Sequence, residues 1–163
     1  MNQKIENPRL AYIGTGKISE FHIPAFKKAG FNISSISSRK NSKNITNFAK
    51  KFEIENIIWD WKELSDRTDE YEAIMIATDT KVTAQILEKM RETKKPILVE
   101  KPVSLNSKVI SKMMTKNHKN IFVAYNRRYY NSTQFAKKFI DSKPKVHAII
   151  SLPELSHIHL YQN

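Results

Sequence analysis

Cysteine, long apolar runs and acidic side chains are all scarce in this sequence. The chain has no cysteine, which excludes disulfides, thiolate metal ligands and cysteine nucleophiles. No run approaches the roughly 18 to 20 apolar residues that a membrane span needs. The N-terminus, MNQKIENPRL, has no apolar segment of the kind found in secretory signals. We therefore expect a cytoplasmic protein with no membrane partner.

The shortage of acidic residues leaves a formal net charge of +12. Such an excess suits an anionic partner, which could be a nucleic acid, a membrane surface or a phosphorylated small molecule. The lysine pairs are spread along helix-like segments, however, and such faces often carry lysine for solubility. The stretch YNRRYY at 125–130 alone interleaves arginine with aromatics as a nucleic-acid site would. We favour solvated helix faces and expect no nucleic-acid partner.

Apolar, β-branched runs alternate along the chain with segments of helical spacing, and Asn106 and Asn131 stand where helix N-caps belong. This alternation predicts βαβ units and an α/β fold built on a parallel sheet. Runs such as AIMIA indicate strands buried on both faces. The predicted strands are 10–13, 32–37, 57–59, 73–77, 97–99 and 121–125, and the predicted helices are 18–29, 43–52, 81–93, 107–117 and 132–140.

The pattern changes after the last predicted helix. DSKPKV at 141–146 breaks it, and VHAIISL at 146–152 predicts one more strand near the end of the chain. We therefore predict one domain over 1–125, and over 126–163 a connecting helix and the first strand of a second α/β domain. An unpaired strand leaves an open sheet edge. We expect this segment either to lack order or to pair with another copy of the chain in a homo-oligomer.

Two of the three glycines lie in GTGKISEFH, residues 14–22, directly after an apolar run. Gly14 permits a tight turn, and Gly16 removes a side chain where the backbone of a helix N-terminus approaches a pyrophosphate. The third position of the usual dinucleotide fingerprint is Ser19, a position that mainly serves helix–strand packing. The place between a strand and a helix favours a phosphate-binding turn over a bare turn.

The second predicted strand ends in SISSRK. NAD-binding folds usually carry an acidic residue near this point to hold the ribose hydroxyls. Here Ser38 and Arg39 occupy the position, and a hydroxyl beside a guanidinium suits a 2′-phosphate. The alternative is a solvated turn, or NAD as cofactor. We predict NADP in preference to NAD.

Polar residues also follow the fourth and fifth predicted strands, in ATDT at 77–80 and VEKP at 99–102. Ligands of open α/β sheets bind beyond the carboxyl ends of the strands. Thr78, Glu100 and Lys101 should therefore project, with the glycine turn, towards one crevice. A lysine placed there can serve as an acid–base group, whereas a lysine elsewhere in this chain is best explained by solubility.

Taken in order, GTGKISEFHIPAF, SSR, IATDT, VEKP and VAYNRRYY carry a family resemblance. The sequence resembles the Gfo/Idh/MocA family of sugar oxidoreductases over roughly residues 8 to 150. The resemblance implies a Rossmann-type doubly wound parallel sheet that binds NAD(P), followed by an α/β substrate domain. It also implies hydride transfer between the nicotinamide and a sugar, a sugar derivative or a nucleotide-sugar.

The resemblance further implies residue roles. Lys101 would be the catalytic residue, which orients the sugar hydroxyl and relays its proton, and His22 is interpreted as structural. The cofactor-binding residues would be Gly14, Thr15, Gly16, Lys17, Ile18, Ser38, Arg39, Thr78, Glu100 and Pro102, and the substrate-binding residues Lys101, Asn126 and Arg127.

The chain departs from the family pattern near its end. Family members are usually much longer, and their second domain carries a D-x-x-x-H motif that is absent here. His157 and His159 alternate on one predicted strand face, but with no third ligand in sight we predict no metal site. We expect an NAD(P)-dependent oxidoreductase that is incomplete in this chain, and the alternative is a non-catalytic nucleotide-binding or regulatory module.

Overall fold

The computed structural model describes residues 6–39, 42, 44–114 and 119–142. The chain divides into two compact units, Met1–Tyr125 and Asn126–Asn163, and each is described by itself. The strand expected at 146–152 lies outside the described residues, as do His157 and His159.

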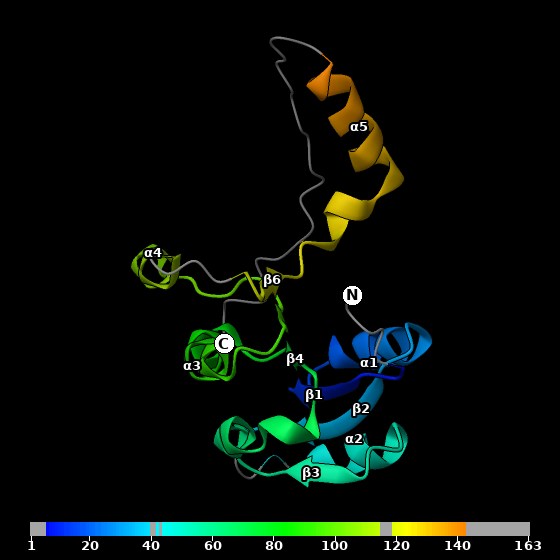
Figure 1. Cartoon of the computed structure of the whole chain (residues 1–163), viewed down its shortest axis with the longest axis vertical. Helices are drawn as coiled ribbons and strands as arrows, with labels where there is room; N and C mark the ends of the chain where they lie inside the picture. The colour runs from blue at the N-terminus through cyan, green and yellow to red at the C-terminus, as the bar shows by residue number, and fades with distance from the viewer. Residues whose placement is uncertain (1–5, 40–41, 43, 115–118, 143–163) are drawn as a thin grey trace. The chain divides into compact units, whose positions relative to one another are not determined.

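The first unit is built on a six-stranded sheet in which every strand pairing is parallel (Figure 1). The strand order is β3-β2-β1-β4-β5-β6, so successive strands are added to one side of β1 up to β3 and to its other side from β4 onwards. The predicted Rossmann-type doubly wound sheet is thereby confirmed. Its strands are β1 (Arg9–Ile13), β2 (Asn32–Ser37), β3 (Asn56–Ile58), β4 (Ala73–Ile76), β5 (Ile97–Val99) and β6 (Ile121–Val123).

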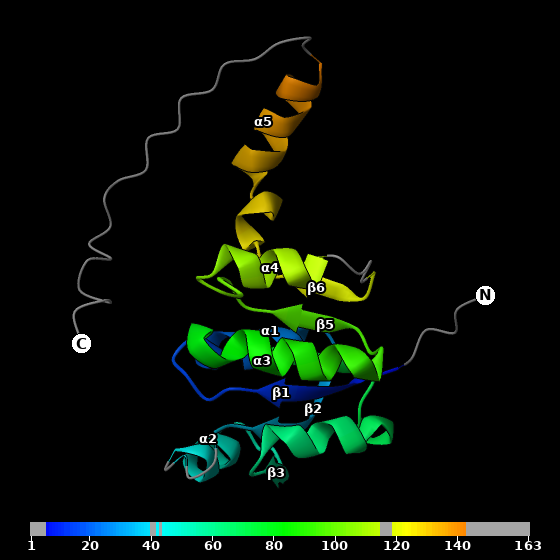
Figure 2. The ribbon, with the colours of Figure 1, turned by 90° about the vertical axis from the view of Figure 1, so that its left-hand side faces the viewer.

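Helices cover both faces of this sheet. Helices α1 (Ser19–Lys28) and α2 (Ile45–Lys51) lie on one face. Helices α3 (Thr80–Met90) and α4 (Ser107–Met114) lie on the other and face the viewer in Figure 2. The connection from β3 to β4 contains two 3-10 helices, η1 (Trp61–Asp66) and η2 (Thr68–Glu70).

The two faces have separate hydrophobic cores because successive side chains of a strand point to opposite sides. On β1, Leu10 and Tyr12 belong to the core beneath α1 and α2, whereas Ala11 and Ile13 belong to the core beneath α3. All four are at most 1% exposed, so the predicted burial of strands on both faces is confirmed. The sheet is therefore a rigid support for the loops at its carboxyl edge.

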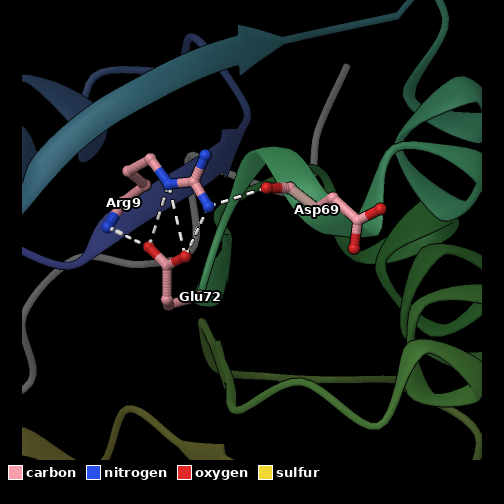
Figure 3. Close-up of polar contacts among 3 residues, drawn as sticks. All are labelled: Arg9, Asp69 and Glu72. Carbon is pink, nitrogen blue, oxygen red and sulfur yellow. Dashed lines mark hydrogen bonds and ion pairs between the residues drawn. The ribbon is translucent and has the colours of Figure 1, made fainter. Parts of the chain in front are cut away.

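At the opposite, amino edge, Arg9 holds Glu72 through both its backbone and its guanidinium (Figure 3). Arg9 Nη2 lies 2.6 Å from Glu72 Oε1, and the Arg9 backbone N–H donates to Oε2 at 2.7 Å. The same Nη2 donates to the carbonyl of Asp69 at 2.7 Å. These bonds hold the segment before β4 against the start of β1, where the two strands pair in register, Leu10 opposite Ala73.

The second unit begins with the 3-10 helix η4 (Asn126–Tyr129) and continues as α5 (Asn131–Asp141). The helix predicted over 132–140 is confirmed. No residue of α5 is buried among the described residues.

Candidate functional site

The carboxyl ends of the central strands meet at one edge of the sheet. Three backbone N–H groups donate across this edge, each at 2.8 Å, from Gly14 to Ser37, from Ala77 to Ile13 and from Glu100 to Ile76. The structure therefore brings together the ends of β1, β2, β4 and β5, which carry most of the predicted cofactor-binding residues. The crevice of a doubly wound sheet lies at this edge, where the strand order reverses.

Gly14 is required by the fold itself. Its φ is +128°, a backbone conformation that residues other than glycine rarely adopt. A Cβ added at Gly14 would lie 2.0 Å from the carbonyl oxygen of Ala77. The close approach of β1 to the end of β4 therefore depends on the missing side chain.

Gly16 is not required by the fold. Its φ is not in the left-handed range, and a Cβ added there would meet no atom within 4 Å. The backbone N–H groups of Gly16, Lys17 and Ile18 make no hydrogen bond within the part of the chain that the structure describes. They precede α1, whose N-terminus has no side-chain cap. Open space and free donors at a helix N-terminus suit an anion.

The end of β2 is tied to the glycine turn by side chains. Thr15 Oγ1 lies 3.2 Å from Ser38 Oγ, and the two hydroxyls share a hydrogen bond. Ser38 is 7% exposed, whereas Arg39 is exposed. The predicted hydroxyl and guanidinium therefore both lie at the sheet edge, with only the guanidinium freely accessible.

Thr78, at the end of β4, is directed towards the start of α3. Its hydroxyl lies 2.9 Å from Thr83 Oγ1. Thr83 itself donates to the carbonyl of Asp79 at 2.9 Å, so the Thr78 O–H is the donor of the shared bond. The Asp79 carboxylate caps α3 by accepting from the Lys81 N–H at 2.8 Å. Thr78 thus lines the edge through a hydroxyl that is already partnered.

The EKP turn follows β5. Glu100 Oε2 accepts a hydrogen bond from the backbone N–H of Lys101 at 2.9 Å. Lys101 and Pro102 are exposed, and the peptide bond between them is cis. Glu100 is therefore the fixed residue of the turn, and Lys101 presents an accessible ammonium group beside it.

His22 reaches Glu100 from the first turns of α1, which the sequence did not predict. His22 Nε2 lies 3.2 Å from Glu100 Oε1, and His22 Nδ1 lies 3.1 Å from the hydroxyl of Tyr12 on β1. Burial lowers the pKa of His22, an effect that the Glu100 carboxylate opposes. Burial also raises the pKa of Tyr12. The imidazole is therefore neutral at pH 7. No sequence pattern relates the three residues; only the folded chain places them together.

Asn126 and Arg127, predicted at the substrate, open the second unit and are both exposed. Their role at the substrate stays a prediction. Among the described residues there is no group of three potential metal ligands. Within the same residues, none of the helices has the length and apolar character to cross a membrane.

Comparison with known proteins agrees with this geometry. Residues 9–126 match the family model of the Gfo/Idh/MocA proteins, described as an oxidoreductase family with an NAD-binding Rossmann fold. The chain belongs to the Gfo/Idh/MocA family. The resemblance read from the glycine turn and the EKP turn is confirmed, and both motifs lie within the matched residues of this family member.

A curated relative is the uncharacterized oxidoreductase YrbE of Bacillus subtilis strain 168, which is 32% identical over 121 residues. The match covers 72% of this Gfo/Idh/MocA chain and 35% of YrbE, so the chain spans about a third of that relative's length.

Among solved structures, apo levoglucosan dehydrogenase superposes with a TM-score of 0.74 at 24% identity, covering 85% of this chain and 39% of that one. Myo-inositol dehydrogenase from Lactobacillus casei, in complex with NAD(H) and myo-inositol, superposes with a TM-score of 0.72 at 20% identity. That match covers 83% of this chain and 41% of the other. At these identities the likeness shows the fold.

Proposed function

We propose that this chain binds a nicotinamide dinucleotide at the carboxyl edge of its sheet, with the pyrophosphate over the turn at 14–18. The observation that carries the proposal is Gly16. The fold leaves open space at this glycine and free N–H groups beside it, and the family model is that of an NAD-binding Rossmann fold. A bound pyrophosphate would accept from these N–H groups and complement the positive end of α1.

We further propose NADP in preference to NAD. The end of β2 carries Ser38 and Arg39 where an acidic side chain would hold the ribose hydroxyls of NAD. An exposed guanidinium makes bidentate, charge-assisted bonds with a phosphate. The hydrogen bond between Thr15 and Ser38 supports this placement, because it holds the β2 end against the glycine turn.

The proposed reaction is hydride transfer between the nicotinamide and a carbon that bears a hydroxyl in a sugar or sugar derivative. When bound, the nicotinamide supplies the hydride acceptor or donor. As the neutral amine, Lys101 Nζ takes the hydroxyl proton and becomes an ammonium as the alcohol becomes a carbonyl; in the reverse direction the ammonium returns that proton. Asn126 and Arg127 supply hydrogen-bond donors for other sugar hydroxyls. Two neighbours are crystallised with levoglucosan and with myo-inositol, respectively, which supports a polyhydroxylated substrate.

Cofactor binding is tested by titrating the chain with NADPH and with NADH while nicotinamide fluorescence is followed. We expect NADPH to bind more tightly, and Arg39→Ala to weaken NADPH by roughly 10- to 100-fold, the range of a charge-assisted hydrogen bond. NADH affinity should change little. Arg67→Ala is the matched control, because Arg67 is another exposed cation that pairs with Glu63 away from this edge. Equal affinities for the two cofactors, or equal losses in both variants, would contradict the NADP assignment.

Turnover is tested separately with NADP+ and a panel of inositols, free sugars and nucleotide-sugars. Lys101→Met should abolish turnover and leave NADPH affinity within about threefold, because the methionine keeps the stem and removes the proton carrier. Cofactor binding by the unmodified chain without turnover of any of these compounds would favour the alternative, a non-catalytic nucleotide-binding module.

A further inference from the structure

Three polar side chains form a continuous line across the first unit, from β1 through α1 to the end of β5. Tyr12 is fully buried on β1. Its hydroxyl lies 3.1 Å from His22 Nδ1, and His22 Nε2 lies 3.2 Å from Glu100 Oε1. The side chains of His22 and Glu100 are 21% and 17% exposed. The line therefore joins the helix behind the glycine turn to the EKP turn.

Each atom in this line has one role. A carboxylate only accepts, so the proton of the neutral imidazole lies on Nε2 and is donated to Glu100. Nδ1 is then the acceptor, and the Tyr12 O–H donates to it. The second oxygen of Glu100 accepts the backbone N–H of Lys101. Both oxygens of Glu100 are thus engaged, one by α1 and one by the backbone that carries Lys101.

We propose that His22 is a positioning residue: by holding the Glu100 carboxylate it fixes the backbone at Lys101 relative to the glycine turn. Its link to the cofactor rests on the proposed function, in which the glycine turn holds the pyrophosphate and Lys101 lies at the nicotinamide. Tyr12 orients the imidazole from the other side.

The physical reason is the cost of leaving Glu100 without its partner. A carboxylate that is mostly buried and has lost a hydrogen-bond donor turns towards water. When the Glu100 side chain turns, its other oxygen leaves the Lys101 N–H, and the backbone of the turn loses the bond that fixes it. An apolar side chain at position 22 would fill the space of the imidazole, but it has no N–H group to donate to Glu100. It would therefore not prevent the Glu100 side chain from turning.

The first test uses the chain without cofactor. Hydrogen exchange at the Lys101 amide is measured by NMR in the unmodified chain, in His22→Leu and in His22→Gln, whose terminal amide can still donate to Glu100. We expect exchange at Lys101 to speed up about tenfold in His22→Leu, as for a lost charge-assisted bond, and by less than about threefold in His22→Gln. The Ala77 amide, which donates to Ile13 at the same edge, is the internal control. Unchanged exchange at Lys101 in His22→Leu, or equal changes at Lys101 and Ala77, would overturn the proposal.

The second test separates a local effect of His22 on the EKP turn from a general loss of affinity across the whole cofactor site. Binding of NADPH is compared with binding of 2′-phospho-ADP-ribose, which has the same phosphates and lacks the nicotinamide. We expect His22→Leu to lose about tenfold in NADPH affinity and less than about twofold in affinity for the fragment, with His22→Gln restoring NADPH. Equal losses for the two ligands, or no loss for NADPH, would overturn the proposal.

The two tests also keep the proposals distinguishable. If the unmodified chain binds neither ligand, the proposed function fails, and the Lys101 amide still decides whether His22 fixes the turn. If His22→Leu does not fold, His22→Met serves instead, because methionine also fills the space of the imidazole and has no N–H group to donate to Glu100. The same rise in exchange at Lys101 is then expected, and its absence would overturn the proposal.

Discussion

At the scale of single residues, the three glycines of this chain sit in three different environments. Gly14 has a positive φ and a backbone oxygen 2.0 Å from any added Cβ. Gly30 has a positive φ of +88° but open space around it, and Gly16 has neither constraint. The glycine turn thus contains one residue that the fold needs and one that it does not.

Alanine substitutions should rank in that order. We expect Gly14→Ala to lower the free energy of unfolding by more than about 2 kcal/mol, Gly30→Ala by about 1 kcal/mol and Gly16→Ala by less than about 0.5 kcal/mol. Urea unfolding followed by circular dichroism measures all three. A Gly16→Ala variant as unstable as Gly14→Ala would show that the fold, rather than a ligand, requires the second glycine.

The burial of His22 makes the free energy of unfolding depend on pH. Burial lowers its pKa in the folded chain below the ordinary value of 6.5. At a pH between the pKa of His22 in the folded chain and its pKa in the unfolded chain, the unfolded chain binds more protons than the folded one. The free energy of unfolding therefore falls as the pH falls through this range. The groups that face the imidazole are Tyr12 and Glu100.

The other histidines also titrate in this range, so the measurement is a comparison. Unfolding free energies at about pH 7.5 and about pH 5.5 should differ more for the unmodified chain than for His22→Gln, which has no imidazole to protonate. Parallel pH profiles for the two proteins would mean that His22 is equally protonated in the folded and unfolded states.

At the scale of elements, the sequence predicted every described strand and α-helix in its place, because apolar runs and helical spacing alternate so regularly, but it did not predict the 3-10 helices η2 and η4. The residues at which the strands and helices begin and end were less predictable. The strand expected to reach Tyr125 stops at Val123. Asn106 accepts the N–H of Lys108 at the start of α4, as predicted, whereas Asn131 lies inside α5 and makes no cap bond there. Such ends depend on local hydrogen bonds that apolar spacing does not encode.

The candidate site was predictable to the same degree. Residues that follow a strand directly, such as Ser38 and Glu100, could be placed at one edge from topology alone. The contact between His22 and Glu100 could not, because it depends on how α1 is rotated above β1.

Helix α3 carries a prediction of its own at its start. Asp79 caps the helix by accepting the Lys81 N–H, and it follows Thr78 at the crevice edge. Asp79→Ala should lower the free energy of unfolding by about 1 kcal/mol, and Asp79→Asn, which keeps the acceptor, by no more than a few tenths. Urea unfolding measures both. An equal loss in the two variants would assign the effect to the charge at the helix N-terminus instead of the cap.

At the scale of the whole molecule, topology accounts for the position of the candidate site. The strand order reverses between β1 and β4, which leaves the loops after those strands free to diverge and admit a ligand. At the amino edge, the Arg9–Glu72 bonds tie the start of β1 to the segment before β4 (Figure 3). The sheet is thus tied together at both edges, and the candidate ligand contacts lie on loops that this scaffold positions at the carboxyl edge.

The central claim is that the glycine turn holds a dinucleotide pyrophosphate, and calorimetric titration of Gly16→Ala with NADPH tests it most directly. We expect this variant to fold with unchanged stability and to bind NADPH at least about tenfold more weakly than the unmodified chain, because a methyl group would stand in the phosphate's place. Unchanged NADPH affinity in a folded Gly16→Ala protein would contradict it and place the phosphates elsewhere.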